Sequence, residues 1–233
     1  VHRRRRHRRD AHSSVKVTTT CYGQALAWIG MMLVHPEYRR RGIATDLMNQ
    51  SLRFLRAGNV RCIKLDATPV GQPVYERLGF QAEWTFHRWQ FDARKENHRS
   101  CSDSDHPAGK PTFPLDHQAF GVDRTAWLTR LAEGSFFLQA DGGFGMIRAG
   151  QLADYLGPIT AVDRGVAHQI IVQLLARSRG KVFWDIPGPN HHAIDIARQL
   201  GFEPVRDLTR MWLGDTFTPD LTLQFAICDP GTG

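Results

Sequence analysis

Cysteine is scarce in this chain of 233 residues, and Cys21, Cys62, Cys101 and Cys228 are far apart. Their spacing matches neither a zinc site nor the dense disulfide framework of a small secreted domain, so we expect reduced thiols and no metal. No apolar run approaches the roughly 20 residues that a membrane-spanning helix needs, and we expect no membrane partner. The N-terminus also lacks the apolar stretch of a signal peptide, which predicts a cytoplasmic protein.

Positive charge is concentrated at one end. The net charge is +7, and residues 1–10 hold six arginines and one aspartate, so only +2 remains for the rest of the chain. We predict a basic, disordered tail over residues 1–14. Such a tail is either solvated or a contact for nucleic acid. Zinc-finger spacing, a helix-turn-helix signal and an aromatic single-strand motif are all missing, so we expect no nucleic-acid partner from the rest of the sequence.

The sequence after the tail reads as two α/β halves. In the first, β-branched or largely apolar runs predict strands at 15–22, 26–34, 60–67 and 81–91. Between them, Leu47, Met48, Leu52 and Leu55 recur at helical spacing, and a short helix is predicted within 71–80.

Composition then changes, because residues 92–114 contain almost no large apolar side chains, which predicts a linker over 93–115 between domains at 15–92 and 116–230. For the second domain we predict helices around 116–132, 166–177 and 191–200, and strands at 135–140, 143–149, 151–162, 181–186, 202–213 and 221–227.

The two halves repeat one another. "RLGFQAEWTFHRW" aligns with "QLGFEPVRDLTRMW", "KLDATP" with "FWDIPGP", and "RGIA" at 41–44 with "RGVA" at 164–167. These alignments pair Gly79 with Gly201, Arg88 with Arg210 and Asp66 with Asp185, so the sequence predicts a tandem duplication of one α/β unit.

Two motifs in the first half resemble the GNAT N-acetyltransferase superfamily. "HPEYRRRGIA" is similar to the acetyl-CoA signature of that family through Arg39, Gly42 and Ala44, and "VYERLGF" to its later Tyr-x-x-x-Gly-Phe segment. The resemblance covers residues 15–91 closely and 116–227 loosely. It implies two tandem GNAT-like domains of the α/β (α+β) class, each a mixed, mostly antiparallel sheet flanked by helices.

The resemblance implies that acetyl-CoA binds at the arginine-rich turn. A helix N-terminus already carries partial positive charge and unpaired N–H groups, so a basic first turn is either a solvated loop before a surface helix or the binding site of an anion. The expected cradle for the diphosphate comprises Arg39, Arg40, Arg41, Gly42, Ile43, Ala44 and Thr45. The pantetheine would lie between two splayed strands, along Met32, Leu33 and Val34.

The chemistry that the resemblance implies is attack of an amine, from a small molecule or a protein, on the thioester carbonyl. A backbone N–H near Met32 would stabilise the oxyanion, and Tyr75, which also packs on its own helix, would protonate the leaving thiolate. The general base stays unassigned. His35 and Glu37 belong to the phosphate loop, and a strand-end aspartate such as Asp66 is usually a cap or turn residue.

The second half departs from the pattern. It keeps Gly165 and Ala167, but Val162 stands at the first signature position and Ala197 at the tyrosine position, so we predict a non-catalytic domain. This domain either completes the acceptor pocket or buries an edge of the first sheet. The histidines that follow Asn190 indicate a capped, exposed turn rather than a metal site.

Only about fourteen residues precede the first predicted strand, where the family has roughly 50 residues of helix and strand. We therefore expect that the first domain is incomplete, that another part of the chain fills the gap, or that activity has been lost. A missing strand would also expose a sheet edge through which two copies could form a homodimer. Three hypotheses stay open: an acetyl-CoA-dependent N-acetyltransferase, a CoA-binding protein with impaired or regulatory function, and a nucleic-acid-associated module that uses the arginine tail.

Overall fold

The computed structural model describes residues 15–92, 111–178 and 180–233, so the predicted tail and most of the predicted linker lie outside the described residues. The first half runs β1 (Val15–Tyr22), β2 (Leu26–Val34), the 3-10 turn η1 (Pro36–Tyr38), α1 (Ile43–Ala57), β3 (Cys62–Ala67), α2 (Gln72–Glu76) and β4 (Gln81–Asp92). The second half runs α3 (Asp116–Phe120), α4 (Thr125–Ala132), β5 (Phe136–Ala140), β6 (Gly143–Arg148), β7 (Asp154–Ala161), α5 (Arg164–Leu175), β8 (Lys181–Pro187), α6 (His191–Gln199), β9 (Glu203–Gly214) and β10 (Gln224–Ala226).

The strands of both halves form one continuous sheet, flanked by helices. Its order is β1-β2-β3-β9-β4-β8-β7-β6-β5, with β10 added beside β7. Neighbouring strands are antiparallel except for β2 with β3 and β7 with β8, which are parallel. The predicted α/β class with a mixed, mostly antiparallel sheet is therefore confirmed, and the sheet runs through both halves without a break.

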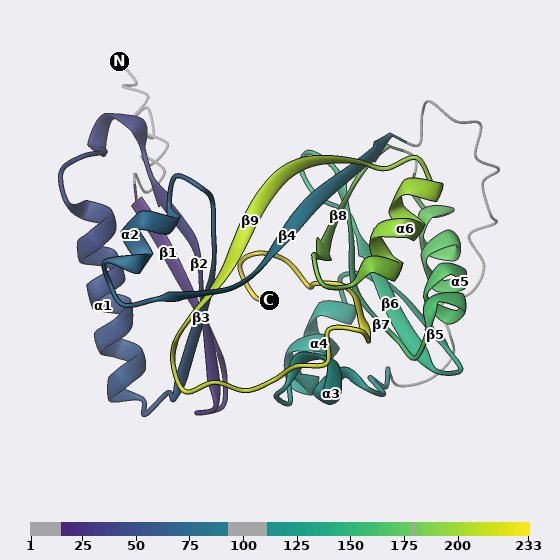
Figure 1. Cartoon of the computed structure of the whole chain (residues 1–233), viewed down its shortest axis with the longest axis horizontal. Helices are drawn as coiled ribbons and strands as arrows, with labels where there is room; N and C mark the ends of the chain where they lie inside the picture. The colour runs from purple at the N-terminus through teal and green to yellow at the C-terminus, as the bar shows by residue number, and fades with distance from the viewer. Residues whose placement is uncertain (1–14, 93–110, 179) are drawn as a thin grey trace, which may run out of the picture.

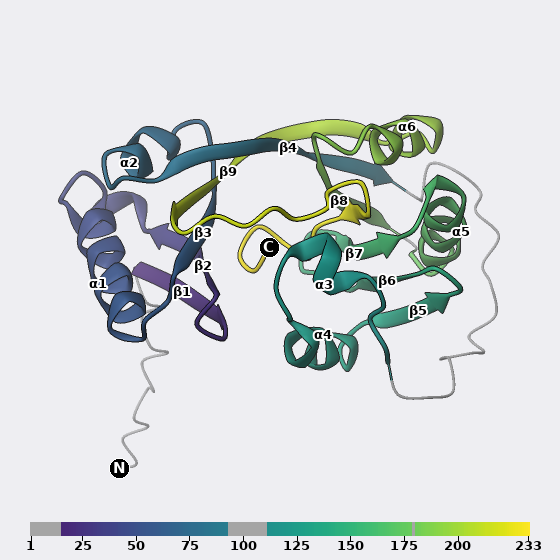
Figure 2. The same cartoon turned by 60° about the horizontal axis from the view of Figure 1, so that its bottom comes forward.

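The two halves exchange their longest strands. The long strand of the second half, β9, pairs with β3 of the first half from Cys62–Gly214 to Ala67–Thr209. Reciprocally, β4 of the first half pairs with β8 of the second, and β4 and β9 pair with each other along most of their length. Figures 1 and 2 show these two long strands crossing from one half to the other. The halves are therefore joined through main-chain hydrogen bonds as well as through the chain itself.

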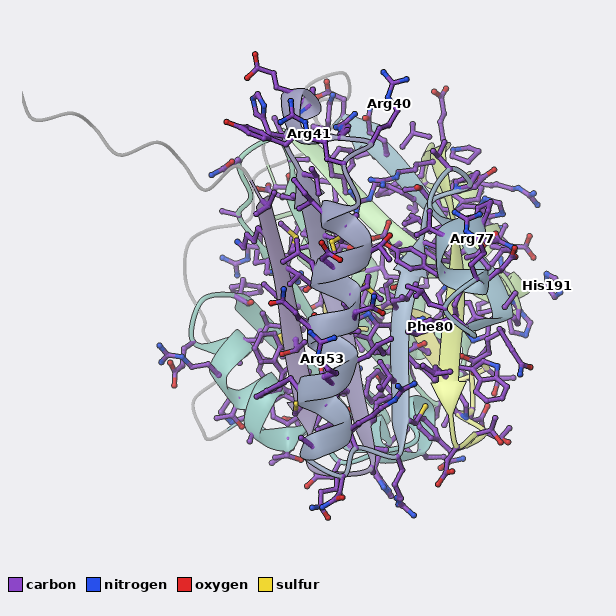
Figure 3. The ribbon with its side chains drawn as sticks, turned by 90° about the vertical axis from the view of Figure 1, so that its left-hand side faces the viewer. Arg40, Arg41, Arg53, Arg77, Phe80 and His191 are labelled. Carbon is purple, nitrogen blue, oxygen red and sulfur yellow. The ribbon has the colours of Figure 1, made fainter. Side chains whose placement is uncertain are left out.

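Helix α1 covers the sheet of the first half with the face that its sequence predicts. Met48, Leu52 and Leu55 are buried against strand residues such as Ile63 and Leu65, and each such buried side chain contributes roughly 1.5–3 kcal/mol. Figure 3 looks onto this helix, with Arg53 on its outer surface. Neither α1 nor any other helix within the described ranges is long and apolar enough to cross a membrane.

The predicted helix around 116–132 is wrong in its continuity, because the structure has two short helices there. Helix α3 ends at Gly121, whose φ of 96° is left-handed, and α4 begins only at Thr125. A Cβ on Gly121 would lie 2.5 Å from the ring of Phe217, so the break brings the chain against the segment that follows β9. The predicted last strand at 221–227 is also shorter, reduced to β10 at 224–226.

Candidate active site

Strands β2 and β3 pair at one end and diverge at the other. Their parallel register runs only from Leu26–Cys62 to Trp28–Lys64, although β2 continues to residue 34 and β3 to residue 67. Beyond Trp28 the backbone of β2 is bent, because Met31 has a φ of 52°, unusual for a residue with a side chain. The result is a wedge-shaped opening between two neighbouring strands of the first half.

This opening leads into a cavity of about 810 Å³ whose walls come from both halves. From the first half it is lined by Ile29–Leu33 of β2, by Leu65, Asp66 and Thr68 at the end of β3, by Tyr75 and by Arg88. The second half lines it with Arg148, Gly150–Ala153, Tyr155, Phe183, Arg206, Leu208 and Asp229–Gly231. Two of the expected pantetheine residues, Met32 and Leu33, line this cavity together with Tyr75, whereas Val34 does not.

The last segment of the chain packs directly on β2 at this cavity. A Cβ on Gly30 would lie 2.5 Å from the Cα and carbonyl oxygen of Gly231, so only a glycine permits this approach. The hydroxyl of Tyr22 donates to the carbonyl oxygen of Thr232 at 2.6 Å, which holds the same segment against the first half. The second half thus forms a wall of this cavity, and through β9 it also covers the edge of the first-half sheet at β3. That the cavity is an acceptor pocket stays a prediction.

The arginine-rich turn follows the C-terminal end of β2, and none of its residues lines the cavity. Arg40 and Gly42 have left-handed backbone, with φ values of 61° and 79°, and α1 then begins at Ile43 with no side-chain cap. Arg39 Nε donates to the carbonyl oxygen of Val34 at 3.1 Å, and Arg41 stacks over the ring of Tyr38 at 5.4 Å. Figure 3 shows Arg40 and Arg41 at the start of α1.

The first amides of α1 are therefore available to an anion, because no described side chain caps them. The reason for glycine at position 42 is its backbone conformation. A Cβ there would meet no atom within 4 Å, but a φ of 79° strains any residue that carries a side chain.

Tyr75 lies on α2 with its half-buried ring packed edge-on against Phe80, at a centroid distance of 6.2 Å. Burial raises the pKa of this phenol above its usual value. Its hydroxyl makes no hydrogen bond to any residue that the structure describes. The side chain thus presents a protonated phenol at the edge of the cavity.

Asp66, the one candidate base at the end of β3, is fully buried and bound by Arg210 of β9. Arg210 Nε and Nη2 donate to its two carboxylate oxygens at 2.9 and 3.0 Å. Burial raises the pKa of Asp66 to about 6, although Arg210 opposes the rise. At neutral pH the carboxylate is ionised, but both of its oxygens are occupied by the guanidinium.

The same ion pair occurs a second time, with the halves reversed. Arg88 of β4 donates through Nε and Nη2 to Asp185 of β8 at 2.8 and 2.7 Å, and the hydroxyl of Tyr155 donates to the same carboxylate. Burial lowers the pKa of Arg88, but the hydrogen bonds and charge of Asp185 outweigh it and raise that pKa above its usual value. Each arginine of the sequence repeat thus binds the aspartate of the other half across the exchanged strands, which indicates a structural role for both ion pairs.

The second half has a matching gap between β7 and β8, and this gap is filled by the segment around β10. β7 and β8 pair only from Asp154–Val182 to Leu156–Trp184, after which they diverge as β2 and β3 do. The segment containing β10 enters this gap and bonds both sides: Ala161 donates its N–H to Leu223, and Ile227 donates its N–H to Asp185.

The helix that follows this gap is capped. The carboxylate of Asp163 accepts from the N–H of Val166 at 2.9 Å at the start of α5. The second half therefore offers neither an open gap nor an uncapped helix start. Together with Val162 and Ala197 at the two motif positions, this supports the prediction that the second domain is non-catalytic.

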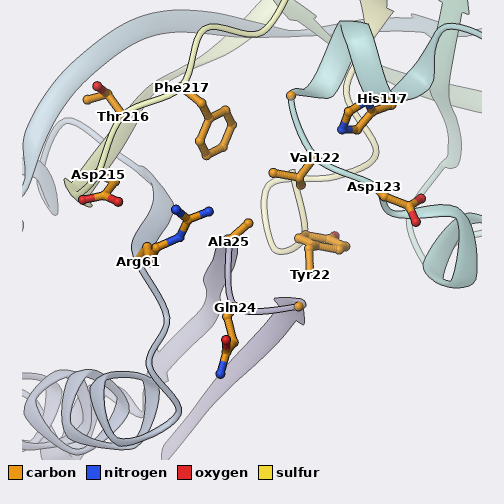
Figure 4. Close-up of a pocket in the computed structure, with 12 residues that line it drawn as sticks. Tyr22, Gln24, Ala25, Arg61, His117, Val122, Asp123, Asp215, Thr216 and Phe217 are labelled. Carbon is orange, nitrogen blue, oxygen red and sulfur yellow. The ribbon is translucent and has the colours of Figure 1, made fainter.

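A second cavity, of about 480 Å³, lies at the other end of β2, where β2 and β3 are hydrogen-bonded. Figure 4 shows Tyr22, Arg61, His117 and Phe217 around it. It is separate from the diverging ends of the strands and contains none of the residues singled out in the sequence.

The histidine pair after Asn190 follows a helix cap. Asn190 is buried; its side-chain oxygen accepts from the N–H of Ala193 at 3.0 Å, and its amide donates to the carbonyl oxygen of Gln224 at 3.0 Å. His191 and His192 are exposed, so the predicted capped turn is confirmed. Within the described part of the chain, no three His, Cys, Asp or Glu side chains lie close enough to hold a metal ion.

Two domain models with the same description, acetyltransferase (GNAT) domain, match residues 10–82 and 112–226. The chain belongs to the GNAT acetyltransferase family. It carries two GNAT domains in tandem, as the sequence repeat predicts. The exact boundaries at 15–92 and 116–230 stay predictions.

Relatives extend over most of the chain. An uncharacterized N-acetyltransferase of Bacillus subtilis, YitH, is 29% identical in an alignment of 194 residues that covers 76% of this chain and 66% of the length of YitH. A crystal structure from Pyrococcus horikoshii, of a protein assigned as an acetyltransferase, has a TM-score of 0.77 at 24% identity and matches 93% of this chain and 75% of its own. A tandem GNAT protein from the clavulanic acid biosynthesis pathway has a TM-score of 0.55 at 16% identity, over 84% of this chain and 77% of its own. The two structures support the fold alone.

Proposed function

We propose that this GNAT protein is an acetyl-CoA-dependent N-acetyltransferase that transfers an acetyl group to a primary amine, with the chemistry in its first half. The observation that carries the proposal is the contrast between the two halves. The gap between β2 and β3 opens into a cavity of about 810 Å³, whereas the matching gap between β7 and β8 is filled by the segment around β10.

Acetyl-CoA fits the features of the first half. The pantetheine would lie along the diverging part of β2 and bond the main chain of Met32 and Val34 beside Leu33. The diphosphate would take the uncapped amides from Gly42 to Thr45, and the exposed side chains of Arg39–Arg41 would attract it over a longer range. The geometry supports these expectations for Met32, Leu33 and the uncapped amides, whereas the contact at Val34 rests on the family resemblance alone.

The reaction joins the acceptor nitrogen to the acetyl carbon and breaks the bond from that carbon to sulfur. A main-chain N–H near Met32 would stabilise the negative charge on the carbonyl oxygen. Tyr75 would donate its proton to the leaving thiolate and then recover a proton from solvent, and its raised pKa keeps the phenol protonated at neutral pH. The amine gives up its own proton to solvent, because Asp66 is occupied by Arg210.

A CoA-binding protein without turnover is the second candidate. The ion pair of Asp66 with Arg210 favours this candidate, because a carboxylate bound by a guanidinium cannot act as the general base. Acetyl-CoA should raise the melting temperature under either proposal, since a ligand that binds only the folded state stabilises it. Absence of any rise at millimolar acetyl-CoA would refute both.

A thiol-release assay over a panel of amines separates the two candidates. We expect Tyr75→Phe to lower kcat by about a hundredfold or more, the range of a lost general acid, with no change in the stabilisation by acetyl-CoA. Tyr38→Phe, at an exposed position in the turn before α1, is the matched control. If none of the amines in the panel leads to thiol release, the CoA-binding protein without turnover is favoured. An unchanged kcat in Tyr75→Phe would exclude the role of Tyr75 as the general acid.

A further inference from the structure

The charges that line the cavity are almost all paired. Arg88 is neutralised by Asp185 and Asp66 by Arg210 through two hydrogen bonds each. Arg148 donates to the carbonyl oxygens of Gly157 and Cys228 and lies 3.4 Å from a carboxylate oxygen of Asp229. These three pairs leave no net charge on the wall.

Arg206 is the exception. It lines the same cavity from β9, is exposed, and makes no hydrogen bond or ion pair with any of the described residues. In the ladder between β4 and β9 it lies directly opposite Arg88. Like charges directly opposite in an antiparallel ladder are destabilising, and only Arg88 has a carboxylate to offset this. The cavity wall therefore carries one unbalanced positive charge.

The mouth of the cavity also exposes large apolar side chains. Met31 and Leu33 of β2 are 50% and 53% exposed, and Leu152 of the second half is 84% exposed. Exposed apolar side chains that gather at one concave surface commonly mark a binding site. The exposed apolar side chains come from both halves, and so do the charged side chains of the wall. The apolar mouth and the unbalanced charge therefore lie together only at the boundary between the halves.

We propose that the acceptor is a primary amine that carries one carboxylate on an apolar body, and that Arg206 binds this carboxylate. The inference rests on the proposed acetyltransferase function. A guanidinium binds a carboxylate through two parallel hydrogen bonds. One unbalanced positive charge matches a carboxylate, whereas a phosphate dianion would leave a negative charge uncompensated.

The test compares amines that differ only in the anionic group. A series of ω-amino carboxylates of increasing chain length is assayed by thiol release, each against its own amide, so that the reacting amine stays nearly unchanged. We expect kcat/KM for the best carboxylate to exceed that for its amide by about tenfold, as for a hydrogen bond to a charged group. In Arg206→Gln this preference should disappear, with the amide reacting at its wild-type rate. Arg206→Lys should retain part of it.

Arg53→Gln is the matched control, because Arg53 is an exposed arginine on the outer surface of α1 (Figure 3) and should leave the preference intact. Equal kcat/KM for carboxylate and amide in the wild type would overturn the proposal, as would an equal loss for both in Arg206→Gln. A stronger preference for an aminoalkyl phosphate would overturn the choice of carboxylate.

The outcome is distinguishable from failure of the acetyltransferase function. If neutral amines are acetylated without any preference, the function stands and this inference falls. If no amine is acetylated, the stabilisation of the CoA-bound protein by each carboxylate and its amide is compared by melting temperature. A larger shift for the carboxylate that is lost in Arg206→Gln supports the inference, and equal shifts or none overturn it.

Discussion

Replacing Asp185 with asparagine removes the carboxylate that holds the exchanged strand β4 to β8. The side chain of Asp185 is fully buried, and it accepts two hydrogen bonds from Arg88 and one from Tyr155. Asparagine has nearly the same shape but no charge. The guanidinium of Arg88 lies over the rings of Tyr155 and Phe183, and its side chain is only 17% exposed. In the variant it would lack a counter-ion there.

The expected loss in the free energy of unfolding is about 3–5 kcal/mol, the range for breaking a buried ion pair by removing one partner. Such a loss is a large fraction of the roughly 5–15 kcal/mol that stabilises a typical domain. The matched control is Asp207→Asn, which breaks the exposed 2.7 Å contact between Asp207 of β9 and His87 of β4. An exposed pair is worth at most about 1 kcal/mol.

The measurement is chemical unfolding followed by tryptophan fluorescence, since Trp184 is buried one residue before Asp185. Arg88→Met and the double variant complete a double-mutant cycle, in which the double variant should lose less than the sum of the single losses. A loss below about 1 kcal/mol in Asp185→Asn, or strictly additive losses, would refute the view that this pair anchors the exchange.

Three further predictions concern the cofactor site. Gly42→Ala should cost about 1–2 kcal/mol because of the left-handed φ of 79°, and should weaken CoA binding; Gly134→Ala, at a turn without positive φ, should do neither. Calorimetric titration should give one acetyl-CoA per chain, because the gap of the second half is filled at Leu223–Ile227, and a stoichiometry of two would contradict this. Since burial raises the pKa of Tyr75 above its usual value, ionisation of this phenol should not lower the rate between about pH 7 and 9, and a loss of rate in that range that is absent in Tyr75→Phe would contradict the assignment.

Local patterns in the sequence predicted most of the elements of this fold. The apolar spacing in α1, the β-branched run of β1 and the stop at Gly58 depend on neighbours within one turn or one strand, and the structure has these elements where the periodicity indicates them. The break at Gly121 was missed, because the reason for it is the ring of Phe217, nearly a hundred residues away.

The candidate site divides in the same way. Tyr75, Met32 and Leu33 were named from motifs, and the structure brings them to one cavity. Arg206, Asp229 and Leu152 were not, because nothing local distinguishes them from solvated residues. A residue from the other half becomes part of the wall only through long-range pairing. Unbalanced charge opposite Arg88 is visible only once the register of β4 and β9 is known.

The sequence by itself determined the duplicated unit, the family and the alignment of Arg88 with Arg210 and of Asp66 with Asp185. Only the tertiary structure decided that each arginine binds the aspartate of the other half. The physical reason is that backbone hydrogen bonds are the same in any register and with any strand. The local sequence of a strand such as β9 does not determine whether it pairs with a strand of its own half or of the other half. The packing and charge pairing of the whole sheet determine which strand it pairs with.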